Sequence, residues 1–164
     1  MTRPLWAPWR LEYITRAGEQ ESCVFCAAAA GEAGDGSLVV ARLEHGLALL
    51  NKFPYASGHL MVAPLRHVGE LSELKPIEVA ELHGLTTAAI DALRQVYAPD
   101  AFNVGWNLGA VAGGSIAAHL HEHIVPRWAG DTNFMPVLAD VKVMPEHLLA
   151  TRDRLRDAWP PRVS

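Results

Sequence analysis

The sequence predicts an α+β fold, an antiparallel sheet of about five strands with one long helix and a C-terminal helix. Two observations lead to this fold class. Short apolar runs of strand length are grouped before and after one long segment of helical period, and such grouping favours an antiparallel sheet over a doubly wound parallel one. The 164 residues also suit one compact domain. We therefore expect a single domain over residues 1–164, with an N-terminal arm over residues 1–36.

The first strands follow a small, glycine-rich stretch at residues 27–36, which we expect to be a surface loop. Apolar runs at residues 38–40 and 47–50 flank a polar turn, the pattern of a hairpin. Turn-forming residues then interrupt the chain up to Gly58, and residues 59–64 resume a strand. Three strands are thus expected before any clear helix.

The long helix is predicted over residues 76–97, with Pro76 suited to its first turn. Its apolar positions recur in steps of three and four residues, the period of one buried helical face: Ile77, Leu82, Leu85, Ala89, Leu93 and Val96. Two further strands are expected at residues 102–107 and 116–125, the second ended by Pro126. A C-terminal helix is expected over residues 145–159.

The charge and hydropathy of the chain limit the classes of partner. Lys and Arg number 14 against 18 Asp and Glu, for a formal net charge of -4, so the chain has no overall positive field to hold a nucleic-acid polymer. No apolar run approaches the ~18 residues of a membrane span, and the N-terminus has no signal-peptide pattern. We expect a cytoplasmic protein that binds neither membranes nor nucleic-acid polymers.

Three histidines alternate along one predicted strand. Side chains alternate between the faces of a strand, so His119, His121 and His123 are expected to project from one face. An exposed polar face is the structural alternative, but buried imidazoles side by side are costly unless each has a partner. The pattern therefore indicates either a metal centre or imidazole chemistry on an anion.

A glycine-rich stretch precedes the histidines at residues 107–115. Glycines let backbone N–H groups approach a phosphate closely, and short polar side chains add donors. Such loops are often only turns, but this one ends four residues before His119. It predicts a phosphate-binding loop beside the histidines, and so favours phosphoryl or nucleotidyl chemistry over a bare metal site.

The two cysteines of the chain, Cys23 and Cys26, are spaced as C-x-x-C. In a reducing cytosol this pair is more typical of metal ligands or a redox pair than of a structural disulfide. No βαβ pattern follows to support the redox alternative. Free reduced thiols remain a third interpretation.

The segment GGSIAAHLHEHIVPRW resembles the signature of the histidine triad (HIT) superfamily. The segment LLNKFPYASGHLMVAPLRHVGEL is similar to the strand-turn-strand of that family. The opening LWAPWRLEYI with CVFC resembles its branch of diadenosine tetraphosphate phosphorylases and related nucleotidyltransferases. The resemblance extends from about Leu5 to Leu148 and implies a HIT-like fold and a homodimer.

Carried over by position, the resemblance implies that His121 is the nucleophile on the α-phosphorus. It implies that His123 hydrogen-bonds the phosphate and the leaving oxygen, and that Asn51 contacts the ribose. The remaining implied substrate contacts hold phosphate oxygens: Asn107, Gly113, Gly114 and Ser115. Glu122, at an apolar position of the motif, should point from the opposite face and needs a partner or an exposed site.

The resemblance also proposes a structural zinc ion held by Cys23, Cys26, His67 and His119. Four protein ligands leave no open position for water, so such an ion is structural rather than catalytic. His59 is the competing fourth ligand.

The leading hypothesis is therefore phosphorolysis of diadenosine tetraphosphate to ADP and ATP, with inorganic phosphate as co-substrate and a covalent nucleotidyl-histidine as intermediate. One alternative is hydrolysis of the same substrates or of nucleoside phosphoramidates. A small metal-dependent oxygenase would lack a nearby carboxylate and would leave the glycine-rich loop unexplained. A nucleotide-binding sensor without turnover is the other alternative.

Overall fold

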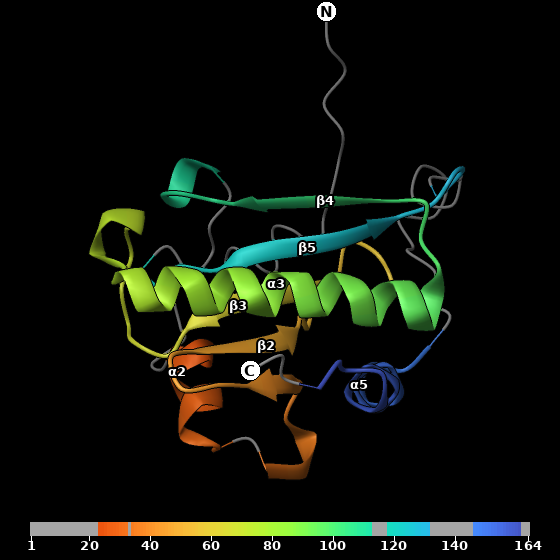
Figure 1. The fold of residues 1–164 in the computed structure, drawn as a ribbon, viewed down its shortest axis with the longest axis horizontal. Helices are drawn as coiled ribbons and strands as arrows, with labels where there is room; N and C mark the ends of the chain where they lie inside the picture. The colour runs from red at the N-terminus through yellow and green to blue at the C-terminus, as the bar shows by residue number, and fades with distance from the viewer. Residues whose placement is uncertain (1–22, 33, 113–117, 132–145, 162–164) are drawn as a thin grey trace, which may run out of the picture.

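The computed structural model describes residues 23–32, 34–112, 118–131 and 146–161 (Figure 1). Helices and short 3-10 turns are α2 (Val24–Ala30), η1 (Gly34–Gly36), η2 (Leu71–Glu73), α3 (Pro76–Tyr97), η3 (Ala110–Ala112) and α5 (Leu148–Asp157). Strands are β1 (Val39–Arg42), β2 (Gly46–Leu50), β3 (Leu60–Pro64), β4 (Ala101–Trp106) and β5 (Glu122–Arg127). This is the predicted α+β arrangement, with both predicted helices present.

The five strands form one antiparallel sheet in the order β1-β2-β3-β5-β4. The central pair joins β3 to β5, with Met61 opposite His123 and Val62 opposite Glu122. Because side chains alternate along each strand, these two pairs point to opposite faces of the sheet. One pair of strands therefore supplies residues to both faces.

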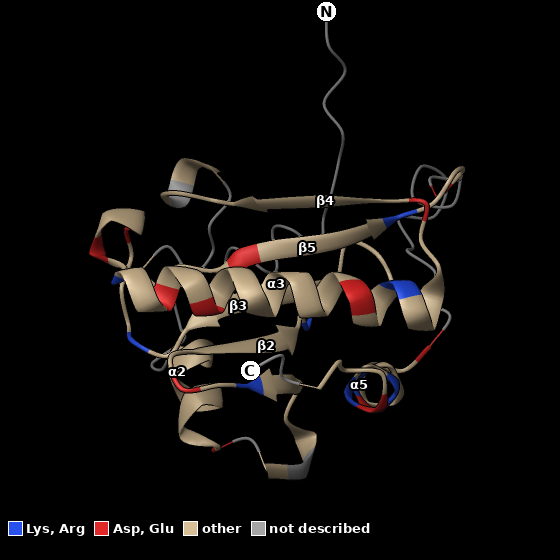
Figure 2. Cartoon of the chain, viewed as in Figure 1, with Lys and Arg blue, Asp and Glu red and all other residues tan. Residues whose placement is uncertain are grey.

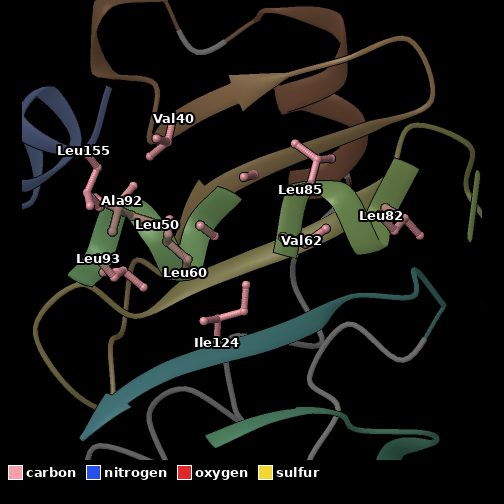
Figure 3. Close-up of a cluster of buried hydrophobic side chains, with 12 residues drawn as sticks. Val40, Leu50, Leu60, Val62, Leu82, Leu85, Ala92, Leu93, Ile124 and Leu155 are labelled. Atoms are coloured by element: carbon pink, nitrogen blue, oxygen red, sulfur yellow. The ribbon is translucent and has the colours of Figure 1, made fainter. Parts of the chain in front are cut away.

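The helix α3 covers one face of the sheet (Figure 1). Its apolar side packs on the sheet, and α5 extends the same core through Leu155 (Figure 3). The labelled members of this core come from β1, β2, β3, β5 and both helices: Val40, Leu50, Leu60, Val62, Leu82, Leu85, Ala92, Leu93, Ile124 and Leu155. The predicted face is therefore buried from Leu82 to Leu93 and partly buried at Val96, whereas Ile77 in the first turn is 57% exposed, so that position of the prediction was wrong.

The other face carries a smaller core built around α2. Phe25 is fully buried there with Leu47, Leu49, Met61 and Ala63 of β2 and β3. The period-two alternation of β2 explains the division, because Leu47 and Leu49 face α2 while Ala48 and Leu50 face α3. The candidate site lies on this α2 face.

Two predictions about the elements were wrong. Residues 27–30 end the helix α2 instead of forming a loop, so a helix precedes the three strands. Alanine has the highest helix propensity, and Gly31 ends the helix with a positive φ of 77°. The expected strand 116–125 is β5, which begins only at Glu122 and contains Pro126. Pairing with β3 stops at Ile124, so the missing N–H of Pro126 costs no bond to that strand.

Charged residues are dispersed over the described elements. Figure 2 shows basic and acidic positions side by side on α5 and mostly acidic positions along α3. Glu81 of α3 is one of these, and its carboxylate accepts the backbone N–H groups of His45 and Gly46 at 2.6 and 2.8 Å. Among the helices that the structure describes, none is long and apolar enough to cross a membrane.

Candidate active site

Four histidines gather on the α2 face, where β3 and β5 meet. His59 immediately precedes β3, two residues before Met61, so the two side chains point to the same face of the sheet. Met61 lies opposite His123 on β5. His119 and His121 belong to the segment that leads into β5, where the backbone N–H of Leu120 donates to the carbonyl of Val68. Two of the three motif histidines therefore lie just before the strand rather than on it.

The imidazole of His121 has one nitrogen committed to the backbone. Its Nδ1 lies 2.8 Å from the carbonyl oxygen of His119, and because a carbonyl only accepts, Nδ1 carries the proton. In the neutral ring Nε2 then holds the lone pair. Burial lowers the pKa of His121, while the bond to the His119 carbonyl opposes that shift. The neutral nucleophilic form is therefore favoured at neutral pH.

His123 is oriented by a chain of hydrogen bonds that runs in one direction. The backbone N–H of Tyr55 donates to Nδ1 of His59 at 3.0 Å, so the neutral His59 ring carries its proton on Nε2. That Nε2–H donates to Nδ1 of His123 at 2.9 Å. Nδ1 of His123 is thus an acceptor, and the ring's own proton lies on Nε2. The relay aims a proton at the space beside His121.

The rings around His123 form a packed group. The His121 and His123 centroids are 4.9 Å apart, and Tyr55 stacks 4.7 Å from His59 and 6.0 Å from His123. Burial, with a smaller contribution from His121, lowers the pKa of His123 to about 4. His123 is therefore neutral at physiological pH, and its Nε2–H can donate a hydrogen bond to an anionic oxygen.

Two asparagines lie at the edge of this group. Nδ2 of Asn107 is 3.4 Å from Nε2 of His123, and since that nitrogen carries a proton, the carboxamide would present its oxygen there. Asn51 accepts the backbone N–H of Phe53 at 2.9 Å, and its Nδ2 lies 3.5 Å from Nδ1 of His59. Both predicted contact residues therefore adjoin the His59–His123 pair.

The predicted phosphate contacts Gly113, Gly114 and Ser115 lie outside the described residues. Glu122 lies where the alternation places it, on the α3 face, and its Oε2 accepts the hydroxyl proton of Thr86 at 2.6 Å. The acidic residue at an apolar motif position thus has a partner on α3, away from the histidines.

The predicted metal ligands converge in space. One ligand atom from each of Cys23, Cys26, His67 and His119 lies within 4.8 Å of the others. Sγ of Cys23 is 3.2 Å from Nδ1 of His119, and Sγ of Cys26 is 3.2 Å from Nδ1 of His67. In a tetrahedral zinc site with ordinary bond lengths, a sulfur and a nitrogen ligand are about 3.6 Å apart. The four atoms therefore fit one zinc ion.

The surroundings of the cluster favour metal binding. Nε2 of His119 donates to the carbonyl of Pro64 at 2.9 Å, which leaves Nδ1 unprotonated and turned to the thiols. His67 follows Arg66, whose guanidinium pairs with buried Glu78 at 2.6 Å and lowers the pKa of that carboxyl to about 2. This ion pair anchors the His67 loop to the start of α3. His59, the competing ligand, pairs with His123 instead.

Three members of this arrangement are not predicted by local sequence patterns. The sequence predicts His59 only as a competing metal ligand, although it shares the alternation of Met61 and so faces the same side as His123. Phe25 packs on His119 and His121 with centroids 5.0 and 4.8 Å apart. Tyr55 covers the His59–His123 pair. A contact across β3 and β5 has no local sequence pattern.

A family model described as the HIT domain matches residues 35–130. The chain is 43% identical over 162 residues to a protein of Mycobacterium tuberculosis named AP-4-A phosphorylase, a match that covers 94% of this chain and 83% of that one. It is 33% identical over 96 residues to the asymmetrical bis(5'-nucleosyl)-tetraphosphatase of Schizosaccharomyces pombe, covering 58% and 52% of the two chains.

The fold is similar to the crystal structure of a Zn-bound histidine triad family protein from Mycobacterium smegmatis. The TM-score is 0.67 at 29% sequence identity, and the match covers 84% of this chain and 92% of that one. A relative of the same fold therefore binds zinc, the metal that the four-residue cluster here fits.

Proposed function

Because this chain belongs to the HIT family, we propose that it cleaves dinucleoside polyphosphates, with phosphorolysis of diadenosine tetraphosphate to ADP and ATP as its main reaction. The observation that carries the proposal is the 43% identity to a protein named AP-4-A phosphorylase, which extends over 94% of the chain. The tetraphosphatase relative matches a shorter segment and favours hydrolysis as the second candidate.

In the first step, the lone pair on Nε2 of His121 attacks the α-phosphorus of the substrate. A P–N bond forms and the P–O bond to the leaving nucleotide breaks. The leaving oxygen takes the electron pair and is stabilised by a hydrogen bond from the Nε2–H of His123, so ATP departs as an anion and AMP stays on His121. Nδ1–H of His121 keeps its bond to the His119 carbonyl, which supports the positive charge that develops on the ring.

In the second step, an oxygen of inorganic phosphate attacks the same phosphorus. That oxygen is an unprotonated oxygen of the phosphate dianion; as its bond to phosphorus forms, the P–N bond breaks and the electron pair returns to Nε2 of His121. The product is ADP, His121 is neutral again, and His123 keeps its Nε2 proton throughout. If water attacked instead, the product would be AMP.

We assign the remaining substrate contacts from their positions and chemistry. Asn51 adjoins the His59 side of the pair and is proposed to bind the ribose, and Asn107 adjoins Nε2 of His123 and is proposed to bind a phosphate oxygen. Gly113, Gly114 and Ser115 are retained as proposed phosphate contacts because small residues expose backbone N–H groups.

We propose that Cys23, Cys26, His67 and His119 hold a structural zinc ion. Bound there, the ion would cross-link α2, the His67 loop and the segment entering β5. The donor set and the Nε2 bond of His119 to Pro64 support this assignment. Thiol ligands require a reducing environment, which is the reason for keeping the cytoplasm as the proposed location.

A homodimer is proposed through the β4 edge of the sheet. β4 ends the strand order, and its residue Val104 is 44% exposed. At the other edge, α5 packs on β1, and Arg156 binds the carbonyl of Val39. Among the strands that the structure describes, none pairs with the outer edge of β4, and such an edge with an exposed apolar side chain is suited to pairing with a second copy. Sedimentation of the protein and of a Val104→Lys variant tests this assignment.

The decisive test of the function is incubation of the purified protein with diadenosine tetraphosphate, with and without inorganic phosphate. Phosphorolysis gives ADP and ATP only when phosphate is present. Hydrolysis gives AMP and ATP in both conditions, and would replace the main reaction by the second candidate. Absence of cleavage in both conditions would contradict both.

A further inference from the structure

Among the described residues, Phe25 is the only Phe, Tyr or Trp whose ring contacts both His119 and His121. Its centroid lies 5.0 Å from His119 and 4.8 Å from His121, with the planes tilted by 41° and 32°. Phe25 is fully buried, and His121 is 6% exposed. The ring therefore occupies one side of the proposed nucleophile and excludes water from it.

The backbone of α2 holds Phe25 between the two cysteines of the metal cluster. Cys23 is the N-cap of this helix, and Cys26 lies in its first turn. The sulfur atoms of both cysteines contact Nδ1 of His119. The cysteines and Phe25 thus approach the segment 119–121 from the same helix, the cysteines at His119 and the aromatic ring at His119 and His121.

The other constraints on His121 leave a role for this ring. Nδ1–H bonds to the His119 carbonyl, and His123 lies on another side with its ring nearly perpendicular, at 68°. A single hydrogen bond allows the imidazole to rock about the bond axis, whereas a packed aromatic face removes that freedom. Phe25 has no polar atom, so it cannot compete with phosphate for Nε2.

We propose that Phe25 is a positioning residue for the nucleotidyl-transfer reaction: it holds the His121 imidazole so that Nε2 faces the α-phosphorus. This inference rests on the proposed function for its kinetic meaning. It assigns to the C-x-x-C helix a second task besides ligating metal, because the residue between the cysteines supports the nucleophile directly.

The test compares Phe25→Leu with Leu47→Val, a matched change in the same buried cluster on β2. Phe25→Leu keeps an apolar side chain but removes the ring, and we expect kcat for diadenosine tetraphosphate with phosphate to fall about 10- to 100-fold with KM within about threefold. Leu47→Val is expected to keep kcat within about twofold. Zinc content and Tm are measured for each protein.

A kcat for Phe25→Leu within threefold of wild type would overturn the proposal, as would equal losses of kcat in the two variants. Loss of zinc from Phe25→Leu, with kcat restored by added zinc, would also overturn it, because the role would then be metal retention alone.

A second measurement does not depend on turnover. In ¹⁵N–¹H relaxation spectra of histidine-labelled protein, His121 is expected to keep the Nδ1–H tautomer in both proteins, but its ring signals should be sharp in the wild type and broadened by added ring motion in Phe25→Leu. An equally rigid His121 ring in the variant would overturn the positioning role. If the wild type cleaves no dinucleoside polyphosphate, the proposed function fails while this measurement still decides the role of Phe25.

Discussion

On the α3 face of the sheet, β3 and β5 contribute Leu60, Val62 and Ile124 to an apolar core, whereas on the α2 face the same two strands contribute Met61 and His123. The α3 face is closed by a 22-residue helix. The α2 face is closed by a seven-residue helix whose N-cap and first turn carry the two cysteines of the proposed metal cluster. The faces differ in chemistry although they share a backbone.

In this small domain, one face of the sheet provides the larger apolar core and the other face provides the proposed reactive groups. The α3 face contributes apolar burial, which scales with the area removed from water. On the α2 face, buried imidazoles are retained in neutral form and hydrogen-bonded in fixed tautomers, an arrangement that costs desolvation but suits the proposed nucleophile and the proposed hydrogen-bond donor. Substitutions on the two faces should therefore change different observables.

The largest expected effect is loss of chemistry in His121→Ala. Without the nucleophile, kcat should fall about 10⁴-fold or more, while the free energy of unfolding should change by less than about 2 kcal/mol. Rapid-quench assays and urea unfolding measure the two quantities, and nucleotide binding should persist. A variant that keeps its kcat would indicate that another group attacks phosphorus, whereas a wild type that binds nucleotide without turnover would indicate a sensor.

Removal of metal is expected to have the next largest effect, and it acts on stability. At free zinc about 1,000 times its dissociation constant, binding contributes about 4 kcal/mol, and a strong chelator should lower Tm accordingly. Cys26→Ser is the matched control, because a protein without the site should melt at the same temperature with and without chelator. Metal analysis should give one zinc per chain for wild type and far less for the variant. A wild-type Tm that is the same with and without chelator would contradict the metal assignment.

A third prediction concerns the α3 face. Leu85 is 1% exposed in the core, and Leu85→Ala should lower the free energy of unfolding by about 3 kcal/mol. Leu71 is 43% exposed, and Leu71→Ala should change it by less than about 0.5 kcal/mol. Both should keep kcat within about twofold at a temperature where they are folded. A large loss of kcat in folded Leu85→Ala would show that the two faces are coupled.

Local sequence patterns predict the α3 face better than the α2 face. The bounds of α3 match the prediction because its period repeats over many turns and Pro76 marks the start. α2 was missed because residues 27–30 are alanines followed by glycine, a composition that suits a loop as well as a helix, and its side packing through Phe25 is tertiary.

The sequence likewise predicts only part of the candidate site. Alternation predicts that the motif histidines share one side, and the family resemblance supplies the metal ligands. The partner of His123 is separated from it by 64 residues, so only the pairing of β3 with β5 brings His59 to it. β5 begins only at Glu122 because Leu120, just before it, donates its backbone N–H to Val68 in the loop after β3 rather than to a strand.

The smallest expected effect is a pH dependence that isolates His123. Its pKa is about 4 in the fold and about 6.5 in an unfolded chain. Between these values the unfolded chain binds more protons, so stability falls as pH drops from about 6.5 to about 4 and is constant above that window. After allowance for its partial exposure, we expect a loss of about 1–2 kcal/mol. Urea unfolding of wild type and of His123→Asn across this range measures it.

The quantity to follow is the difference in free energy of unfolding between wild type and His123→Asn. Other titrating groups, including Glu78 with its pKa of about 2, are present in both proteins and cancel in this difference. The advantage of wild type over His123→Asn should shrink on acidification through the window. A difference that is flat or grows would mean that His123 accepts a proton in the fold. Nδ1 of His123 would then carry a proton and could not accept the Nε2–H of His59, which would contradict the direction assigned to that hydrogen bond.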